Sequence, residues 1–330
     1  MTGAARPGMV APAVQRPAVS TPALPVGASR RSSYADVLLG QGAAAGQLQL
    51  SAGIRDVVRR ADGSVVTTGE ARLDVTLSAD RRVRLLSSEP PLRDPERLRG
   101  APAGSGFRAL ARQALSGPPD APLAQLLDDV PVALMVSGYG PLRAGLDDPA
   151  RRIRLAHVQG MTDVCSGWRA EGSVFEIARA AGALPVPELV PAPRLDPVGD
   201  PAAAPLPAPQ PGTLRRRRRI DVRPGFPATI DAMFRDTWTD ETGEGVLHEY
   251  GVAAVVDKDG RVVELIAEPR VLPWQECPLA AAPVAALVGL PVAAFAVQVA
   301  DLLVGPRSCT HLNDLLRSLA CVPRLLDARP

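Results

Sequence analysis

The sequence predicts an α+β fold in which an antiparallel three-stranded meander carries helices on one face and occurs twice, as a degenerate duplication. In the C-terminal half, strand-like segments come first and helix-like segments follow without alternation, an order that is typical of α+β domains. A proline-rich segment divides the chain, and short sequence matches relate its two sides.

Alternation of apolar and polar residues indicates three strands in the C-terminal half. Residues 230–238 and 247–256 alternate in this way, and a tight turn at 257–260 leads into a third segment, 261–267. A period of two places one face of each strand against a core. The short connections predict an antiparallel meander.

Prolines mark the expected helix starts that follow these strands. Pro278 and Pro291 each suit the first position of a helix, where the missing N–H is not needed. The uncharged run 278–300 is long enough to cross a bilayer, but Pro283 and Pro291 interrupt it. We therefore expect short helices and no membrane span. A final helix carries leucines on one face, at positions 312, 315, 316 and 319.

Composition divides the chain into a disordered tail (1–30), an N-terminal α+β domain (31–182), a proline-rich linker (183–213) and a C-terminal α+β domain (214–330). Ten of the 29 residues in 183–211 are proline, which favours extended polyproline geometry. The tail lacks an apolar core of signal-peptide length, and four cysteines are too few for a disulfide framework. These features predict a cytoplasmic protein.

Charge gives little support for polyanionic partners. All but one of the 37 basic residues are arginine, yet the formal net charge is only +2. The run of five arginines at 215–219 lacks interleaved aromatic residues, so we interpret it as the solvated end of the linker. No nucleic-acid or membrane partner is expected. A protein partner is compatible with the composition, and nothing in the sequence sets the oligomeric state.

A gapless match supports the internal duplication. Residues 79–90 align with 258–269, and Asp, Arg, Val, Leu, Glu and Pro coincide. Each segment follows an apolar run, as expected for two copies of one strand–turn–strand unit.

Histidines and cysteines are concentrated in the C-terminal half. Of three histidines and four cysteines, five lie after Gly245. Two thiols lie at expected helix starts, Cys277 before Pro278 and Cys309 before Thr310, the expected cap, where the helix dipole stabilises a thiolate. Two thiolates and two imidazoles match a zinc site or a mixed iron–sulfur ligand set. The expected metal ligands are His248, Cys277, Cys309 and His311.

Other interpretations of these residues stay open, because their spacing is not that of a zinc finger. Cys309 could act as a nucleophile, with His311 or His248 as its base. Alternatively, the cysteines are small buried hydrophobes and the protein is a two-domain binding or assembly factor without catalysis. Cys321 is expected to pack, and Asp314 to interact with the helix dipole. Common nucleotide-binding, hydrolase and metalloprotease motifs are absent from the sequence.

The C-terminal half resembles a bacterial family of proteins with a domain of unknown function. Its signature is a histidine in a strand, a Pro-x-x-Cys and a closing Cys-Thr-His-Leu, which correspond here to His248, residues 273–277 with one extra residue, and residues 309–312. The resemblance covers about 215–325, and an actinobacterial branch also includes the N-terminal half. It implies no established activity.

The order of these residues is also similar to that of iron–sulfur cluster assembly scaffolds. These have a ligand on a three-stranded meander, a cysteine after the sheet, and a His and Cys before the last helix. Two departures are His248 in place of an aspartate and Glu276 in place of a glycine. The likeness implies a permanently held zinc or iron rather than cluster delivery. In the N-terminal copy Arg97 falls near the position of Cys277, so that copy would be a degenerate partner.

Overall fold

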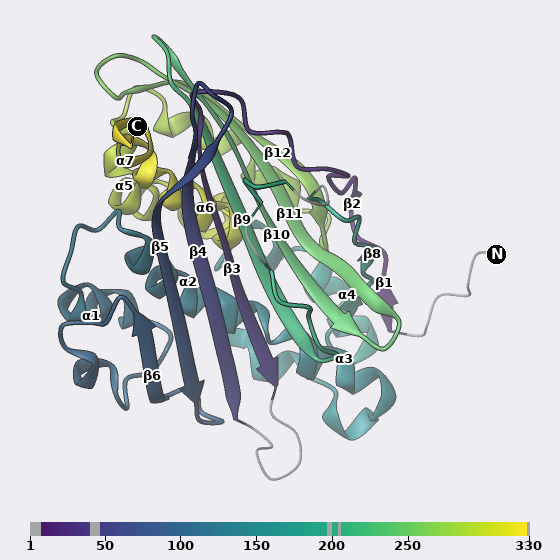
Figure 1. The fold of residues 1–330 in the computed structure, drawn as a ribbon. Coiled ribbons are helices and arrows are strands. Elements are labelled where there is room, and N and C mark those ends of the chain that lie inside the picture. The colour runs from purple at the N-terminus through teal and green to yellow at the C-terminus, as the bar shows by residue number, and fades with distance from the viewer. Residues whose placement is uncertain (1–7, 40–46, 197–199, 204–205, 329–330) are drawn as a thin grey trace.

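The computed structural model describes residues 8–39, 47–196, 200–203 and 206–328. Within these ranges ten strands form one sheet, to which both halves of the chain contribute. Figure 1 shows the helices on one face of this sheet, behind the strands. The mixed architecture, with a large antiparallel sheet and several helices, agrees with the predicted α+β class at that level.

Each half supplies a run of four antiparallel strands. The N-terminal run is β3 (Ser29–Leu39), β4 (Leu48–Arg59), β5 (Val65–Leu77) and β6 (Val83–Glu89). The C-terminal run is β9 (Thr213–Arg223), β10 (Ala228–Asp240), β11 (Gly243–Val256) and β12 (Val262–Leu272). The three strands expected in the C-terminal half correspond to β10, β11 and β12, and β9 precedes them.

The two runs join through their first strands. β3 pairs antiparallel with β9, so the central strand order is β12-β11-β10-β9-β3-β4-β5-β6. Four shorter strands are β1 (Met9–Val10), β2 (Val14–Gln15), β7 (Val186–Pro187) and β8 (Val190–Pro191). β2 extends the sheet beside β12, β8 pairs with β11, and β1 pairs with β7 in a separate parallel pair.

Register shifts between paired strands occur at similar positions in the N-terminal and C-terminal runs. The β4–β5 register shifts after the pair Asp56–Gly69, and the β10–β11 register shifts after the pair Asp236–His248. A second shift follows Thr76 in the β5–β6 pairing and Val255 in the β11–β12 pairing. The β11–β12 pairing has a further shift, between Glu249 and Tyr250, which the β5–β6 pairing lacks.

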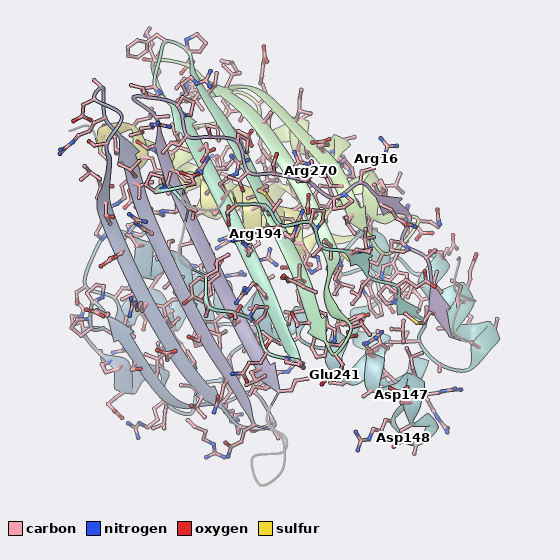
Figure 2. The ribbon with its side chains drawn as sticks, turned by 45° about the vertical axis from the view of Figure 1, so that its right-hand side comes forward. Arg16, Asp147, Asp148, Arg194, Glu241 and Arg270 are labelled. Atoms are coloured by element: carbon pink, nitrogen blue, oxygen red, sulfur yellow. The ribbon has the colours of Figure 1, made fainter. Side chains whose placement is uncertain are left out.

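The described parts of the segments expected as a tail and a linker lie against the face of the sheet away from the helices, whereas residues 1–7, 197–199 and 204–205 lie outside the described residues. Leu24 is 1% exposed and Leu195 is 3% exposed. The Arg235 guanidinium on β10 donates hydrogen bonds to the carbonyls of Ala18 and Pro193, at 2.6 and 2.8 Å. Figure 2 shows Arg194 of the proline-rich segment over the strands on this side. Extended, proline-rich backbone leaves carbonyls free to accept such bonds, so these segments pack although they contain little regular structure.

The longer helices follow the strands of each half. They are α1 (Phe107–Ala114), α2 (Pro122–Val136), α3 (Tyr139–Asp147), α4 (Ser173–Ala181), α5 (Phe295–Leu302), α6 (Thr310–Ser318) and α7 (Val322–Asp327). Short 3₁₀ helices are η2 (Pro95–Leu98), η3 (Pro149–Arg151), η4 (Leu155–Met161), η5 (Ser166–Trp168), η6 (Cys277–Ala280), η7 (Ala282–Leu287), η8 (Val292–Ala294), η9 (Gly305–Arg307) and η10 (Leu319–Cys321). In the part of the chain that the structure describes, none of the helices has the length and apolar character that a bilayer crossing requires.

Candidate metal site and its cavity

Two strands and one helix bring three candidate ligands together. Asp236 on β10 and His248 on β11 are directly opposite each other in the ladder, at the bulge. His311 lies in the first turn of α6, which packs over β10. The ligand atoms of the three residues all lie within 4.8 Å of one another. The three side chains therefore lie between the sheet and α6.

The two imidazole rings are stacked. Their centroids are 4.0 Å apart and their planes are inclined by 20°. His248 Nδ1 lies 3.8 Å from Asp236 Oδ2, and His311 Nδ1 lies 3.7 Å from Cys309 Sγ. The Asp236 carboxylate is thus next to the His248 imidazole, which stacks on the His311 imidazole, and the Cys309 thiol is next to His311. Two of the four expected ligands, His248 and His311, are in the group with Asp236, and a third, Cys309, contacts His311.

Burial keeps both imidazoles neutral. Desolvation, assisted by the Arg216 charge, lowers the pKa of His248 to about 3. Desolvation, His248 and Arg216 together lower the pKa of His311 well below its ordinary value. His248 Nδ1 is buried and has no hydrogen-bond partner among the described residues. Neutral imidazole is the form that ligates metals.

The cysteines do not have the thiolate character expected at helix starts. Desolvation raises the pKa of Cys309 to about 12, and it raises that of Cys277 well above its ordinary value. The prediction was wrong because removal from water outweighs the attraction of a helix terminus. Cys309 itself, and not Thr310, occupies the cap position of α6, without a side-chain capping bond.

Cys277 is buried close to Gly167, and it is near enough to Cys309 for that thiol to contribute to its raised pKa. It is the first residue of η6, and its Sγ lies so close to Gly167 that a Cβ on that glycine would approach it to 2.6 Å. It is not part of the group formed by Asp236, His248 and His311. Cys321, expected to pack, is 2% exposed in the core.

A network of buried charges surrounds Asp236. The Arg216 guanidinium donates to both of its carboxylate oxygens, at 3.1 and 3.2 Å, and lies 3.3 Å from Asp314. Arg218 contacts Asp129 and Asp314. The Arg108 guanidinium lies 3.0 Å from Asp314 as well, so three guanidinium groups face three carboxylates. Desolvation, opposed by Arg216 and reinforced by Asp314, raises the pKa of Asp236 to about 6.

The five consecutive arginines form the central strand and are not a solvated linker end. Arg216 and Arg218 point toward the helices, whereas Arg215 and Arg217 point to the opposite face and pair with Asp36 and Asp196. The interpretation from sequence was wrong because alternation places charges on both faces and each face supplies carboxylates. Asp314, expected to interact with the helix dipole, is instead a buried partner of Arg216 and Arg218.

A signal for Asp236 was present in the sequence pattern of β10. On β10 the helix-facing positions are Ile230, Ala232, Phe234, Asp236 and Trp238, so Asp236 is a carboxylate in an otherwise apolar row. A buried charge of this kind needs a partner, and such residues mark functional sites.

An elongated cavity of about 440 Å³ reaches the two imidazoles. It lies where α2 and α3 of the N-terminal half meet β11 and α6 of the C-terminal half, and both His248 and His311 line it. Its wall is largely apolar and includes Met135, Leu142, Met161, Trp168, Leu184 and Trp274. A concave, mainly apolar cavity with a few convergent polar groups is typical of small-molecule sites.

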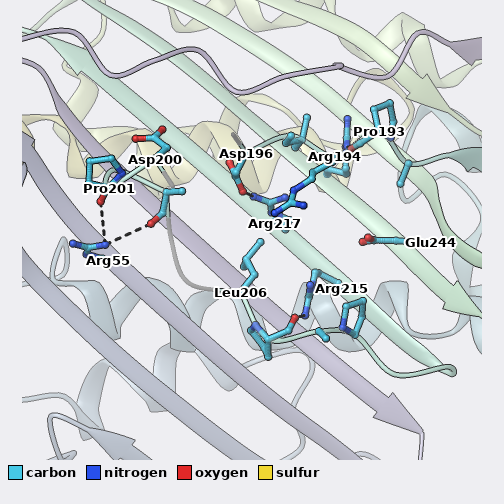
Figure 3. Close-up of a pocket in the computed structure, with 17 residues that line it drawn as sticks. Arg55, Pro193, Arg194, Asp196, Asp200, Pro201, Leu206, Arg215, Arg217 and Glu244 are labelled. Atoms are coloured by element: carbon cyan, nitrogen blue, oxygen red, sulfur yellow. Dashed lines mark hydrogen bonds and ion pairs between the residues drawn. The ribbon is translucent and has the colours of Figure 1, made fainter. Parts of the chain in front are cut away.

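A larger hollow, of about 800 Å³, lies on the other face of the sheet beneath the proline-rich segment. Figure 3 shows Arg217 directed toward Asp196, and the Arg55 guanidinium directed toward the backbone near Pro201. Arg215 also bonds the carbonyl of Pro207, at 2.6 Å. Because these guanidinium groups bond the proline-rich segment, we interpret the polar hollow as the place where that segment is attached to the sheet.

Residues 214–324 match the model of a family described as Protein of unknown function (DUF2889). The match begins in β9 and ends in α7, and it contains Asp236, His248, Cys309 and His311. The helices α2 and α3, which supply much of the cavity wall, lie outside it. No curated protein and no solved structure matches the chain.

Proposed function

We propose that this protein binds one divalent transition metal ion, zinc or iron, through Asp236, His248 and His311. The observation that carries the proposal is the pair of half-buried imidazoles of lowered pKa beside a buried carboxylate, one with an unpartnered Nδ1. Imidazole nitrogens and a carboxylate suit zinc and non-haem iron.

The cavity beside the imidazoles supports an open site rather than a closed structural one. Structural zinc has four protein ligands, whereas catalytic zinc and non-haem iron keep a position for water or substrate. A metal held by two histidines and one carboxylate would keep such a position, and the histidines line the cavity. We therefore favour a metal-dependent enzyme or sensor that acts on a small molecule.

Ligation requires a local movement of the rings. In the stacked arrangement the in-plane lone pairs of the two imidazoles point side by side rather than toward one centre. One ring has to turn about its side-chain torsions before both nitrogens can reach a single ion at about 2.1 Å. The cavity on one side of the rings offers space for this turn.

A mononuclear ion fits the residues better than an iron–sulfur cluster. Clusters are held by several thiolates, and in the described chain Cys309 is the thiol in contact with the imidazole pair. The cysteine-nucleophile alternative has less support, because a thiol with a pKa of about 12 beside imidazoles of lowered pKa retains its proton.

We also propose that the two halves arose by duplication and that only the C-terminal copy kept its ligands. The bulge after Asp56 and Gly69 corresponds to the bulge after Asp236 and His248. Arg31 bonds Asp56 at 2.7 Å, just as Arg216 bonds Asp236. Glycine at the position of His248 leaves the N-terminal copy with an arginine–aspartate pair but without an imidazole.

Metal analysis of protein prepared without oxygen tests the proposed function. We expect about one equivalent of zinc or iron per chain, and loss of that metal in Asp236→Asn and in His248→Gln. Asp231→Asn is the matched control, because Asp231 lies on the same strand with a side chain that is 56% exposed. Circular dichroism verifies that each variant is folded. Metal-free protein that also fails to bind added zinc or iron(II) would refute the proposal.

A further inference from the structure

Arg81 has a left-handed backbone conformation that glycine adopts more readily than arginine. It lies in the turn between β5 and β6 with φ 59°, in the left-handed region. The matching turn between β11 and β12 has Gly260 there, with φ 76°. Glycine adopts this region without strain, whereas other residues there are uncommon and often functional. The side chain of Arg81 therefore needs an explanation beyond the turn.

The Arg81 guanidinium has no counter-charge. Arg81 is exposed, and among the described residues its side chain takes part in no hydrogen bond or ion pair. Partial desolvation, unopposed by any carboxylate, lowers the pKa of Arg81. The next residue, Arg82, differs in this respect, since it pairs with Asp80 at 3.2 Å and donates to the Gly100 carbonyl at 2.9 Å. Adjacent arginines of one turn thus have different surroundings.

Arg81 is also the charged group of the apolar cavity. The described residues that line the cavity include this guanidinium and no carboxylate, and the two histidines are neutral. Arg81, Met135 and Thr310 also line a second hollow, of about 580 Å³, so the two hollows adjoin at Arg81. A single positive charge at the solvent-exposed edge of an apolar cavity favours an anion with an apolar body.

We propose that the cavity binds an amphipathic organic acid, with its carboxylate on Arg81 and its apolar body against Trp168, Trp274 and Met135. A guanidinium binds a carboxylate through two parallel hydrogen bonds. One arginine without a second cation suits a single negative charge better than a phosphate. The inference rests on the proposed function, since it names the ligand class of the same site, and it places part of the acid beside His248 and His311.

Calorimetric titration with matched acids and alcohols tests this assignment. The probes are decanoate with 1-decanol, and 3-phenylpropionate with 3-phenylpropan-1-ol, below any micelle concentration. We expect at least one acid to bind about tenfold or more tightly than its alcohol, because a charge-assisted pair replaces a neutral contact. Arg81→Gln should abolish that preference, and Arg82→Gln, the matched control in the same turn, should retain it.

Titrations of metal-free and zinc-loaded protein separate this inference from the proposed function. A preference for the acid that depends on Arg81 without any zinc uptake would refute the metal site and leave the carboxylate assignment standing. A preference that appears only with zinc and persists in Arg81→Gln would place the carboxylate on the metal and overturn the assignment to Arg81. Equal binding of acids and alcohols, or no binding of either, would overturn it as well.

Discussion

His248 and His311 stack at 4.0 Å with Arg216 close to both rings. Protonating either ring would place a second cation in a buried space that already contains a guanidinium, and desolvation opposes the charge further. Asp236 experiences the reverse, since burial favours its neutral form while Arg216 favours the ionised one. These opposed effects leave two neutral nitrogen donors beside a carboxylate that is largely ionised at pH 7.

The lowered pKa of His248 predicts a pH-dependent stability of the metal-free protein. In the unfolded chain this imidazole takes up a proton near its ordinary pKa of 6.5, whereas in the folded protein it does so only near 3. Stability is therefore complete above pH 6.5 and declines as the pH falls below it. Between pH 7 and 5 the free energy of unfolding should fall by about 2 kcal/mol more in the wild type than in His248→Gln.

Denaturant titrations at several pH values measure this difference. Asp236 contributes the opposite trend, because its pKa is raised to about 6 in the folded state, so its contribution rises as the pH falls through that value. Because Asp236 is present in both the wild type and His248→Gln, its contribution cancels to a first approximation in the difference between their free energies of unfolding. Parallel pH profiles of wild type and His248→Gln would contradict the burial of a neutral imidazole.

The four cysteines should be unreactive in the native protein. All four are buried free thiols, and burial raises the pKa of Cys165, Cys277, Cys309 and Cys321. Since the thiolate is the reactive form, an aromatic disulfide reagent at pH 7.5 should modify them slowly and should titrate all four after denaturation. Rapid modification of Cys309 alone would instead favour the nucleophile hypothesis.

The prediction of the site from sequence depended on the small number of histidines and cysteines in the chain. With three histidines in the chain, the convergence of His248 and His311 could be expected from their positions relative to strands and a helix. Asp236 is one of 35 acidic residues. It differs from most of them because the other helix-facing residues of β10 are apolar. Cys277 was misleading, because its place before Pro278 indicated a helix start but not which way the side chain would point.

At the scale of the element, β9 depends on ion pairs where most central strands depend on apolar packing. Removing one partner of a buried pair leaves an uncompensated charge, which costs about 3–5 kcal/mol. Arg218→Met leaves Asp129 without its guanidinium partner and weakens the environment of Asp314. We expect a decrease of that size in the free energy of unfolding, measured by denaturant titration.

Arg223→Met is the matched control, since Arg223 is the exposed last residue of the same strand. Its effect should stay within about 0.5 kcal/mol. Equal, small effects of the two substitutions would show that the buried ion pairs contribute little to stability.

The strand β9 could not be predicted from the alternation of apolar and polar residues. The strands β10, β11 and β12 could be predicted because their apolar residues alternate with polar ones. A strand that bears charges on both faces has no such contrast, so its arginines suggested solvent exposure. The partners that bury them are distant in sequence, as in the pair Arg30 and Asp221, which are 191 positions apart.

For the whole molecule, the shared sheet predicts that the C-terminal half does not fold alone. A fragment covering residues 208–330 would expose the edge of β9 and leave Arg215, Arg218 and Asp221 without Asp36, Asp129 and Arg30. Unpaired charges and an open strand edge both disfavour the folded state. The fragment should lack a cooperative thermal transition by circular dichroism and give poorly dispersed amide resonances. A well-dispersed spectrum would contradict the prediction.

The arrangement of the two halves could not be read from local patterns. The gapless match of 79–90 with 258–269 indicated related units, but nothing in it shows that β3 and β9 pair. Prolines suggested a linker because they cannot donate in a ladder. The same property lets their segment lie over the sheet and accept hydrogen bonds from arginines.

X-ray absorption at the zinc edge of zinc-loaded protein tests the central claim most directly, because it reports the atoms around the ion. We expect one site with imidazole scattering from two histidines and the remaining ligands light oxygen atoms at about 2.0–2.2 Å, and the same spectrum in Cys309→Ser. A spectrum without imidazole scattering, or one identical to that of zinc-loaded His248→Gln, would contradict this claim.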